Sequence, residues 1–162
     1  MTDLDELPAA QFVARMAPLF EGAPRFLDRL ERARPYGTPG ALFAAAEQIA
    51  LAMSEPEQRE LIDAHPRLGA PPESVSAMSY REQGYDRETG EAVAALERLN
   101  AEYEARFGFR YCVFVNGRSR AALIPELEAA LRQTPHEERA RALRAVVAIA
   151  RDRFAKVAVT PA

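Results

Sequence analysis

Cysteine and histidine are scarce in this chain of 162 residues, which contains one cysteine, Cys112, and two histidines. One cysteine cannot form a disulfide within the chain, so a reducing compartment is the default expectation. The same scarcity leaves too few ligands of the usual types for a zinc site. Basic and acidic residues number 21 and 24, and this balance gives no electrostatic footprint for nucleic acid or for an acidic membrane.

Long apolar runs and targeting signals are missing as well. No run of 18 apolar residues occurs, so we expect no contact with a membrane, and the acidic N-terminus resembles neither a secretory signal nor a transit peptide. These absences make a cytoplasmic protein the default expectation. Apolar residues still form 48% of the chain, enough for a packed core. The length predicts one domain over residues 1–162.

The spacing of apolar residues between proline-bearing turns predicts an all-α protein, a helical bundle. Ser54 and Thr134 each stand three residues before a glutamate, as in a capping box. Thr38 is a candidate N-cap before a proline at the first helical position, and Pro18 should end or kink the first helix. We expect helices over about 9–21, 24–32, 39–53, 55–63, 89–107, 119–131 and 135–156.

A short apolar run at 111–115 (YCVFV) interrupts this helical pattern and is closed by the turn signal Asn116-Gly117. Taken alone, the run indicates a buried strand. Because no second convincing strand is available to pair with it, we interpret it as an extended buried segment within the helical protein. Cys112 is then expected to be an inert buried thiol.

Two expected loops are rich in polar side chains, 65–69 (HPRLG) and 79–84 (SYREQG). A histidine can transfer protons near neutral pH, and a carboxylate beside it can fix its tautomer. Serine and glutamine provide donors and acceptors that suit an amide-rich ligand. From the residues alone a structural role is the favoured interpretation, with His65 as a capping or packing residue and 79–84 as a solvated stretch.

The last expected helix carries many charges. A salt-bridged helix face, and not a nucleic-acid-binding stripe, is predicted for Glu137, Glu138, Arg139, Arg141 and Arg144. His136 lies in the first turn and is expected at the surface. Arg153 lies near the seam of the apolar stripe, where it must either snorkel or form an internal ion pair, unless it has a functional role.

Four motifs occur in order along the chain: His65-Pro66-x-Leu68, Ser79-x-x-Glu82-Gln83, Leu99-Asn100-x-x-Tyr103-x-x-Arg106-Phe107-Gly108-Phe109, and Ile149-x-x-x-Arg153. Together they resemble the OHCU decarboxylase family, in full 2-oxo-4-hydroxy-4-carboxy-5-ureidoimidazoline decarboxylase. The resemblance extends over about residues 8–156. The sequence departs from the commoner family pattern at Arg67, where an acidic residue is frequent, and at Arg110, where Pro-Phe is frequent.

The resemblance implies an all-helical homodimer with no metal and no organic cofactor. It implies the third step of urate breakdown, in which the ureidoimidazoline formed after urate oxidase and hydroxyisourate hydrolase is decarboxylated to (S)-allantoin. His65 would be the catalytic acid/base and Glu82 its acidic partner. The residues expected to bind the ureide substrate are Pro66, Ser79, Tyr80, Arg81, Gln83, Tyr111, Cys112, Val113, Phe114, Val115 and Arg153.

Two alternatives stay open at this point. The departures at Arg67 and Arg110 would suit a protein with the same scaffold that acts on a different ureide. A non-catalytic helical protein that binds a ureide in the same pocket would also retain the four motifs. A nucleic-acid-binding domain is disfavoured by the acidic balance of charge.

Overall fold

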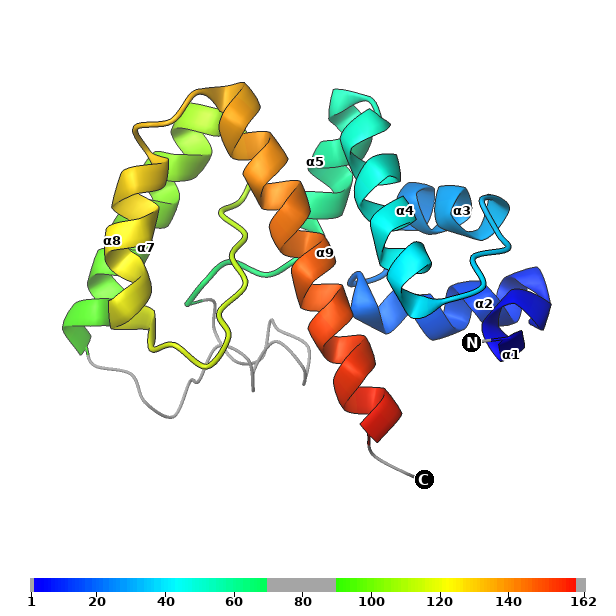
Figure 1. The fold of residues 1–162 in the computed structure, drawn as a ribbon. Helices are drawn as coiled ribbons and strands as arrows, with labels where there is room; N and C mark the ends of the chain where they lie inside the picture. Colours follow the sequence, from blue (N-terminus) through cyan, green and yellow to red (C-terminus); the bar gives the residue numbers. More distant parts are fainter. Residues whose placement is uncertain (1, 70–89, 160–162) are drawn as a thin grey trace. The chain divides into compact units, whose positions relative to one another are not determined.

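Helices form the regular structure of residues 2–69 and 90–159, the part of the chain that this computed structural model describes (Figure 1). No strand occurs in these two ranges, which confirms the prediction of an all-α protein. None of their helices is long and apolar enough to cross a membrane. The chain divides into a terminal unit, Met1–Ala64 with Leu143–Ala162, and a central unit, His65–Ala142. The expectation of one domain over 1–162 stays a prediction.

The terminal unit is built from short helices and the greater part of the last one. Its elements are α1 (Thr2–Glu6), α2 (Ala9–Met16), the 3-10 turn η1 (Ala17–Leu19), α3 (Pro24–Arg32), α4 (Pro39–Ala52), α5 (Glu55–Asp63) and most of α9 (Pro135–Val159). Proline opens α3, α4 and α9 because its missing N–H costs nothing at the first helical position. Pro18 ends α2 as predicted, whereas α1 was not expected from the sequence.

Side-chain caps set the beginnings of three of these helices. The Thr38 hydroxyl accepts a hydrogen bond from the Ala41 N–H at 3.1 Å. In the first capping box, Glu57 accepts from the Ser54 N–H at 3.1 Å, and in the second, the Thr134 hydroxyl accepts from the N–H of residue 137 at 3.2 Å. Both predicted capping boxes are therefore confirmed, and α5 and α9 begin where the sequence indicates.

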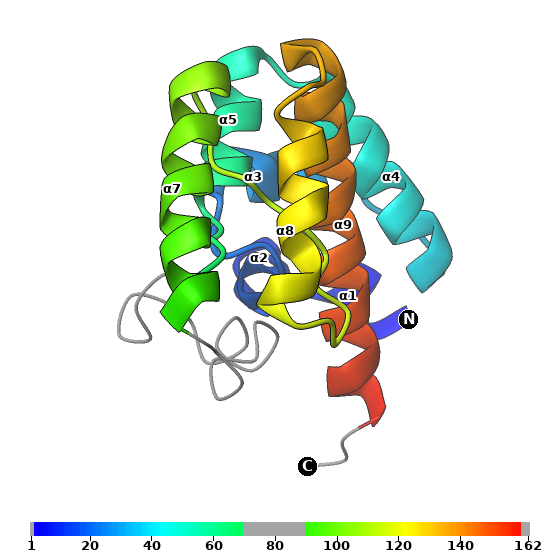
Figure 2. The ribbon, with the colours of Figure 1, turned by 90° about the vertical axis from the view of Figure 1, so that its left-hand side faces the viewer.

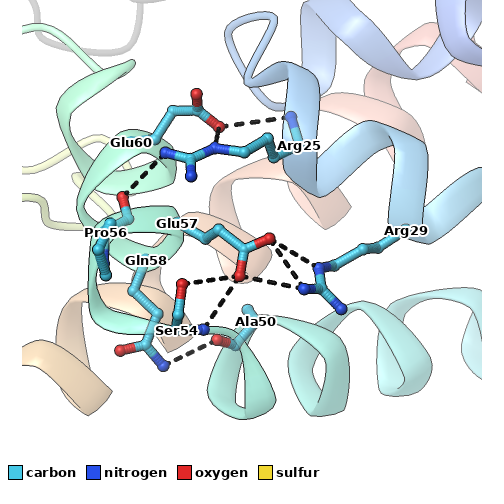
Figure 3. A network of polar contacts seen from close by, with 8 residues as sticks. All are labelled: Arg25, Arg29, Ala50, Ser54, Pro56, Glu57, Gln58 and Glu60. Atoms are coloured by element: carbon cyan, nitrogen blue, oxygen red, sulfur yellow. Dashed lines mark hydrogen bonds and ion pairs between the residues drawn. The ribbon is translucent and has the colours of Figure 1, made fainter.

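Two arginines of α3 fix α5 in place (Figure 3). Arg29 reaches the Glu57 carboxylate at 2.9 Å, and Arg25 reaches Glu60 at 3.2 Å. Each of these arginine side chains is 50% exposed, so each pair contributes at most about 1 kcal/mol. Their importance is geometric, because they fix how α3 and α5 pack within the terminal unit.

The core of the terminal unit is apolar and well filled. Its fully buried large side chains are Phe12, Met16, Phe20, Phe26, Leu30, Leu42, Phe43, Leu61 and Ile62. Gln58 is the buried polar exception on α5, and it donates to the Ala50 carbonyl at 3.0 Å (Figure 3). Because its amide has this partner, the burial of Gln58 does not carry the cost of a buried polar group that lacks a hydrogen bond.

The central unit pairs α7 (Gly90–Phe107) with α8 (Arg120–Ala130). The two helices run in the same direction, and the chain between them returns along their length (Figures 1 and 2). Extended chain advances about 3.3 Å per residue against 1.5 Å in a helix, so a short connection can make this return only if it is extended. This geometry explains the irregular segment 111–115, in which Tyr111, Cys112 and Val115 are buried.

We expect the variant Glu57→Gln to be less stable than the wild type at pH 7 and to lose that difference in acid. Hydrogen bonds from Ser54 and then Arg29 lower the pKa of Glu57 from 4.5 to about 2. A lowered pKa in the fold means that the stabilisation is complete above about pH 4.5 and is lost as the pH falls through 2. Urea unfolding midpoints measured from pH 7 to pH 2 would show this.

The matched control is Glu128→Gln, which changes an exposed glutamate of α8. Its midpoint should follow that of the wild type at every pH. A difference between Glu57→Gln and wild type that stays constant down to pH 2 would contradict the assignment.

Candidate active site

His65 begins an irregular segment directly after α5. Pro66 prevents the helix from continuing, and Gly69 adopts a φ of +86° that other residues rarely tolerate. The side chains of His65 and Leu68 are buried, with exposures of 4% and 3%. The imidazole therefore lies within the protein and not at its surface. Such a position would shield a proton-transfer group from bulk water.

Two long side chains of the central unit fix the backbone of this segment. Arg110 donates from Nη1 to the His65 carbonyl at 3.3 Å. Asn100, buried on α7, donates from Nδ2 to the Leu68 carbonyl at 2.8 Å. The His65 segment has no strand neighbour within the described residues, so these donors satisfy carbonyls that a sheet would otherwise pair.

Arg67 adds a third anchor through a bidentate ion pair with Glu104 of α7. Its Nε lies 2.7 Å from Oε1, and its Nη2 contacts Oε2. The hydrogen bond with Glu104 raises the pKa of Arg67, and the fork-to-fork geometry restricts the orientation of both side chains. The two arginines that depart from the commoner family pattern thus both anchor the segment that carries His65, Arg67 from within it and Arg110 from outside it.

The second polar loop cannot be compared with its prediction. Ser79, Tyr80, Arg81, Glu82 and Gln83 lie outside the described residues. Their assigned roles stay predictions, as does the substrate contact expected of Pro66, which is half-buried beside His65.

Arginines also fix the extended segment 111–115. Arg118 donates to the Phe114 carbonyl at 2.7 Å and to the Val115 carbonyl at 3.0 Å. Arg141 of α9 donates to the Cys112 carbonyl at 2.9 Å. Burial raises the pKa of Tyr111 to about 12, so its phenol is neutral at physiological pH. The segment is extended and buried, as expected, and its binding role stays a prediction.

The motif that begins at Asn100 explains how α7 organises both segments. Tyr103 is fully buried, and its ring centroid lies 4.6 Å from that of Phe107 and 5.2 Å from that of Tyr111. Gly108, with a φ of +77°, ends the helix after Phe107 and turns the chain back. One face of α7 therefore contacts the His65 segment through Asn100 and segment 111–115 through Tyr103.

Arg153 belongs to the terminal unit and is 2% exposed. Its Nη1 donates to the Pro18 carbonyl at 2.9 Å, and its Nη2 lies 3.0 Å from the Glu21 carboxylate. The internal ion pair, one of the two structural possibilities left open by the sequence, is therefore present. The expected contact of Arg153 with substrate stays a prediction.

Sequence reasoning missed the environment of Glu138 and Arg141. Glu138 is completely buried, so it does not belong to an exposed helix face, although it does pair with Arg141 at 2.5 Å. A signal was available, because Glu138 precedes the buried residues Ala142 and Val146 by one and two helical turns. His136 is exposed and Cys112 is a buried free thiol, as expected.

Proton transfer is the chemistry that these residues offer. Arg110 joins the two irregular segments, because it contacts the His65 backbone and directly precedes Tyr111. A buried imidazole is thereby linked to a stretch of non-helical backbone that can offer amide groups to a planar ligand. Within residues 2–69 and 90–159, no group of three or more His, Cys, Asp or Glu side chains is placed to hold a metal ion.

A protein-family model described as OHCU decarboxylase matches residues 5–155 of this chain. A uric acid degradation bifunctional protein of Bacillus sp. (strain TB-90) is 27% identical over 160 residues. That match covers 97% of this chain, which spans about a third (32%) of the Bacillus protein. The 2-oxo-4-hydroxy-4-carboxy-5-ureidoimidazoline decarboxylase of Haloferax volcanii is 25% identical over 140 residues, 85% of this chain and 82% of that protein.

The fold is also that of a solved structure, an OHCU decarboxylase crystallised in the presence of (S)-allantoin. The TM-score is 0.72 at 21% sequence identity, and the superposition covers 88% of this chain and 96% of the other. At this identity the likeness establishes a shared fold.

We expect Asn100→Leu to lower the free energy of unfolding by about 1–3 kcal/mol, because the buried Leu68 carbonyl loses its donor. Leucine is close to asparagine in size, so the loss reports the hydrogen bond more than a cavity. Urea denaturation would measure it. The control is Gln133→Leu, at an exposed amide, which should stay within about 0.5 kcal/mol of wild type. Equal stability of both variants would show that Asn100 does not anchor the segment.

Proposed function

The chain belongs to the OHCU decarboxylase family, and on this premise we propose that it converts 2-oxo-4-hydroxy-4-carboxy-5-ureidoimidazoline to (S)-allantoin and CO₂. The observation that carries the proposal is the family match, which extends over residues 5–155. The Haloferax relative, named for this reaction, is matched over 82% of its length and supports the proposal. Because this chain spans 32% of the Bacillus bifunctional protein, that comparison supports only a place in uric acid degradation.

The reaction needs a proton and an electron sink that accepts the pair released from the broken bond. When the bond to the carboxylate carbon breaks, CO₂ leaves and the electron pair forms a C=C bond to the ureido-bearing carbon, while the electrons of the adjacent C=N bond move to the ring nitrogen, which takes up one proton. The enol that results becomes the carbonyl of allantoin when its hydroxyl proton is lost and the ureido-bearing carbon gains a proton. One proton is consumed for each carboxylate that leaves as CO₂. The ring supplies its own electron sink, so the protein must position the substrate and control the proton.

We assign the proton transfer to His65, with Glu82 as the acidic group that orients it. The buried position of His65 and the fixed carbonyl of its backbone support this role, because a proton can be delivered to one face of a planar intermediate only from a fixed direction. The backbone of 111–115, with Pro66, Ser79, Tyr80, Arg81 and Gln83, would bind the ring and the ureido group. Arg153 would contact the polar end of the substrate.

The family resemblance implies a homodimer, and we propose both a homodimer and a cytoplasmic location for this protein. Light scattering of the purified protein tests the first of these, since a mass equal to that of one chain would exclude a dimer. The contacts of Arg67 and Arg110 with the His65 segment offer no support for a different ureide substrate, because both departures have a role in the scaffold.

We expect His65→Asn to lower kcat/KM for CO₂ release by about 10² to 10⁴, the usual range for the loss of a positioned proton donor. The substrate is generated in place from urate by urate oxidase and hydroxyisourate hydrolase. The structural readout is the urea midpoint, which should show that the variant is folded.

The chain offers a matched control in its second histidine. His136→Asn removes an exposed imidazole at the start of α9 and should keep full activity. If His65→Asn retained a rate within threefold of wild type, the assignment of proton transfer to His65 would be wrong. If the wild-type protein bound ureides tightly without turnover, a binding protein would be the better description.

A further inference from the structure

Arg141 connects α9 with the beginning of segment 111–115. Its Nη1 donates to the Cys112 carbonyl at 2.9 Å, and its guanidinium carbon lies 4.9 Å from the centre of the Tyr111 ring. Its Nε donates to Glu138 at 2.6 Å. One planar cation therefore engages a carbonyl, an aromatic face and a carboxylate, which is a combination that lysine cannot reproduce.

Glu138 determines where that cation lies. Its carboxylate is fully buried, and Oε1 accepts from both Arg141 and the Tyr103 hydroxyl, the latter at 2.7 Å. The second oxygen, Oε2, is buried too and accepts no hydrogen bond within the described part of the chain. The negative charge of Glu138 thus depends on these two donors, since a buried carboxylate is stable only when it is paired.

The two donors to Glu138 keep their protons near neutral pH. Burial lowers the pKa of the Arg141 guanidinium, but its hydrogen bond with Glu138 and the charge of that group outweigh the burial and raise the pKa. Burial, then the hydrogen bond with Glu138, raises the pKa of Tyr103 well above its usual value. Both groups can therefore act as hydrogen-bond donors to Glu138 at physiological pH.

We propose that Arg141 and Glu138 are positioning residues for the decarboxylation, which they serve by fixing the backbone at Tyr111 and Cys112 for substrate binding. The inference rests on the proposed function, because it assumes that segment 111–115 binds the substrate. Arg118 fixes the far end of the segment through Phe114 and Val115. The two arginines thus anchor the chain on either side of Val113, in a place where no neighbouring strand within the described residues could do so.

The test compares Arg141→Lys with Arg144→Lys in the coupled assay that starts from urate. Arg144 lies three residues further along α9, is exposed and pairs with Glu47 at 3.4 Å, so its variant controls for a charge-conserving change on the same helix. We expect Arg141→Lys to raise KM about tenfold, as for the loss of one good binding contact, and Arg144→Lys to leave KM unchanged. A role in folding alone would reduce the active fraction and thereby kcat, and would not change KM.

Tyr103→Phe provides a second variant in case Arg141→Lys does not fold. It keeps the ring that packs on Phe107 and removes only the donor to Glu138. We expect a rise in KM of about threefold, because Arg141 still donates to Glu138 while the carboxylate loses the other of its two donors. The double variant should show less than the product of the two effects, because both changes act through the same network.

Amide hydrogen exchange makes the outcome independent of turnover. We expect faster exchange confined to residues 111–115 in Arg141→Lys and in Tyr103→Phe, with wild-type rates in Arg144→Lys. If the wild type turns over and the KM of folded Arg141→Lys and Tyr103→Phe stays within twofold of it, the inference is overturned and the proposed function stands. If the wild type shows no turnover, the proposed function fails, and unaltered exchange at 111–115 would then overturn the positioning role as well.

Discussion

Main-chain carbonyls outside regular structure need donors, and in this protein long side chains supply them. The carbonyls of a helix accept hydrogen bonds from N–H groups of the same helix, and those of a strand accept from the neighbouring strand. The segments 65–69 and 111–115 belong to neither class. Asn100 and Arg110 bind carbonyls of the first segment, and Arg118 and Arg141 bind those of the second. Non-helical backbone can therefore lie buried in an all-α protein without the neighbouring strand of a sheet.

This dependence on side-chain donors explains why arginine stands at positions where relatives commonly have other residues. Arg67 and Arg110 do not need a new substrate to account for them, because each contacts either the His65 segment itself or the helix beside it. A guanidinium suits the task, since it is always charged and has several donors in a fixed plane. In this protein the two arginines thus help to anchor the segment that carries His65.

Local signals in the sequence were sufficient for most of the helices. Thr38, Ser54 and Thr134 mark helix starts whose chemistry is complete within four residues, and Pro18 ends α2 for a reason equally local. An extended segment at 111–115 was predicted because the sequence offers no second convincing strand to pair with it. The long-range partners were not predictable, since nothing near Arg141 indicates that it reaches Cys112, 29 residues away. Residues 79–83 were assigned through the family resemblance alone, and their roles stay predictions.

In the proposed function, His65 and the anchored, non-helical backbone of 111–115 would together give a product of one configuration. The central claim is that this chain accelerates the decarboxylation and directs the proton to one face. Circular dichroism of the allantoin formed from urate, with urate oxidase and hydroxyisourate hydrolase present, tests both parts directly. The account predicts a rapid signal of the S enantiomer only when this protein is added. Slow formation of racemic allantoin at the same rate with and without the protein would contradict it.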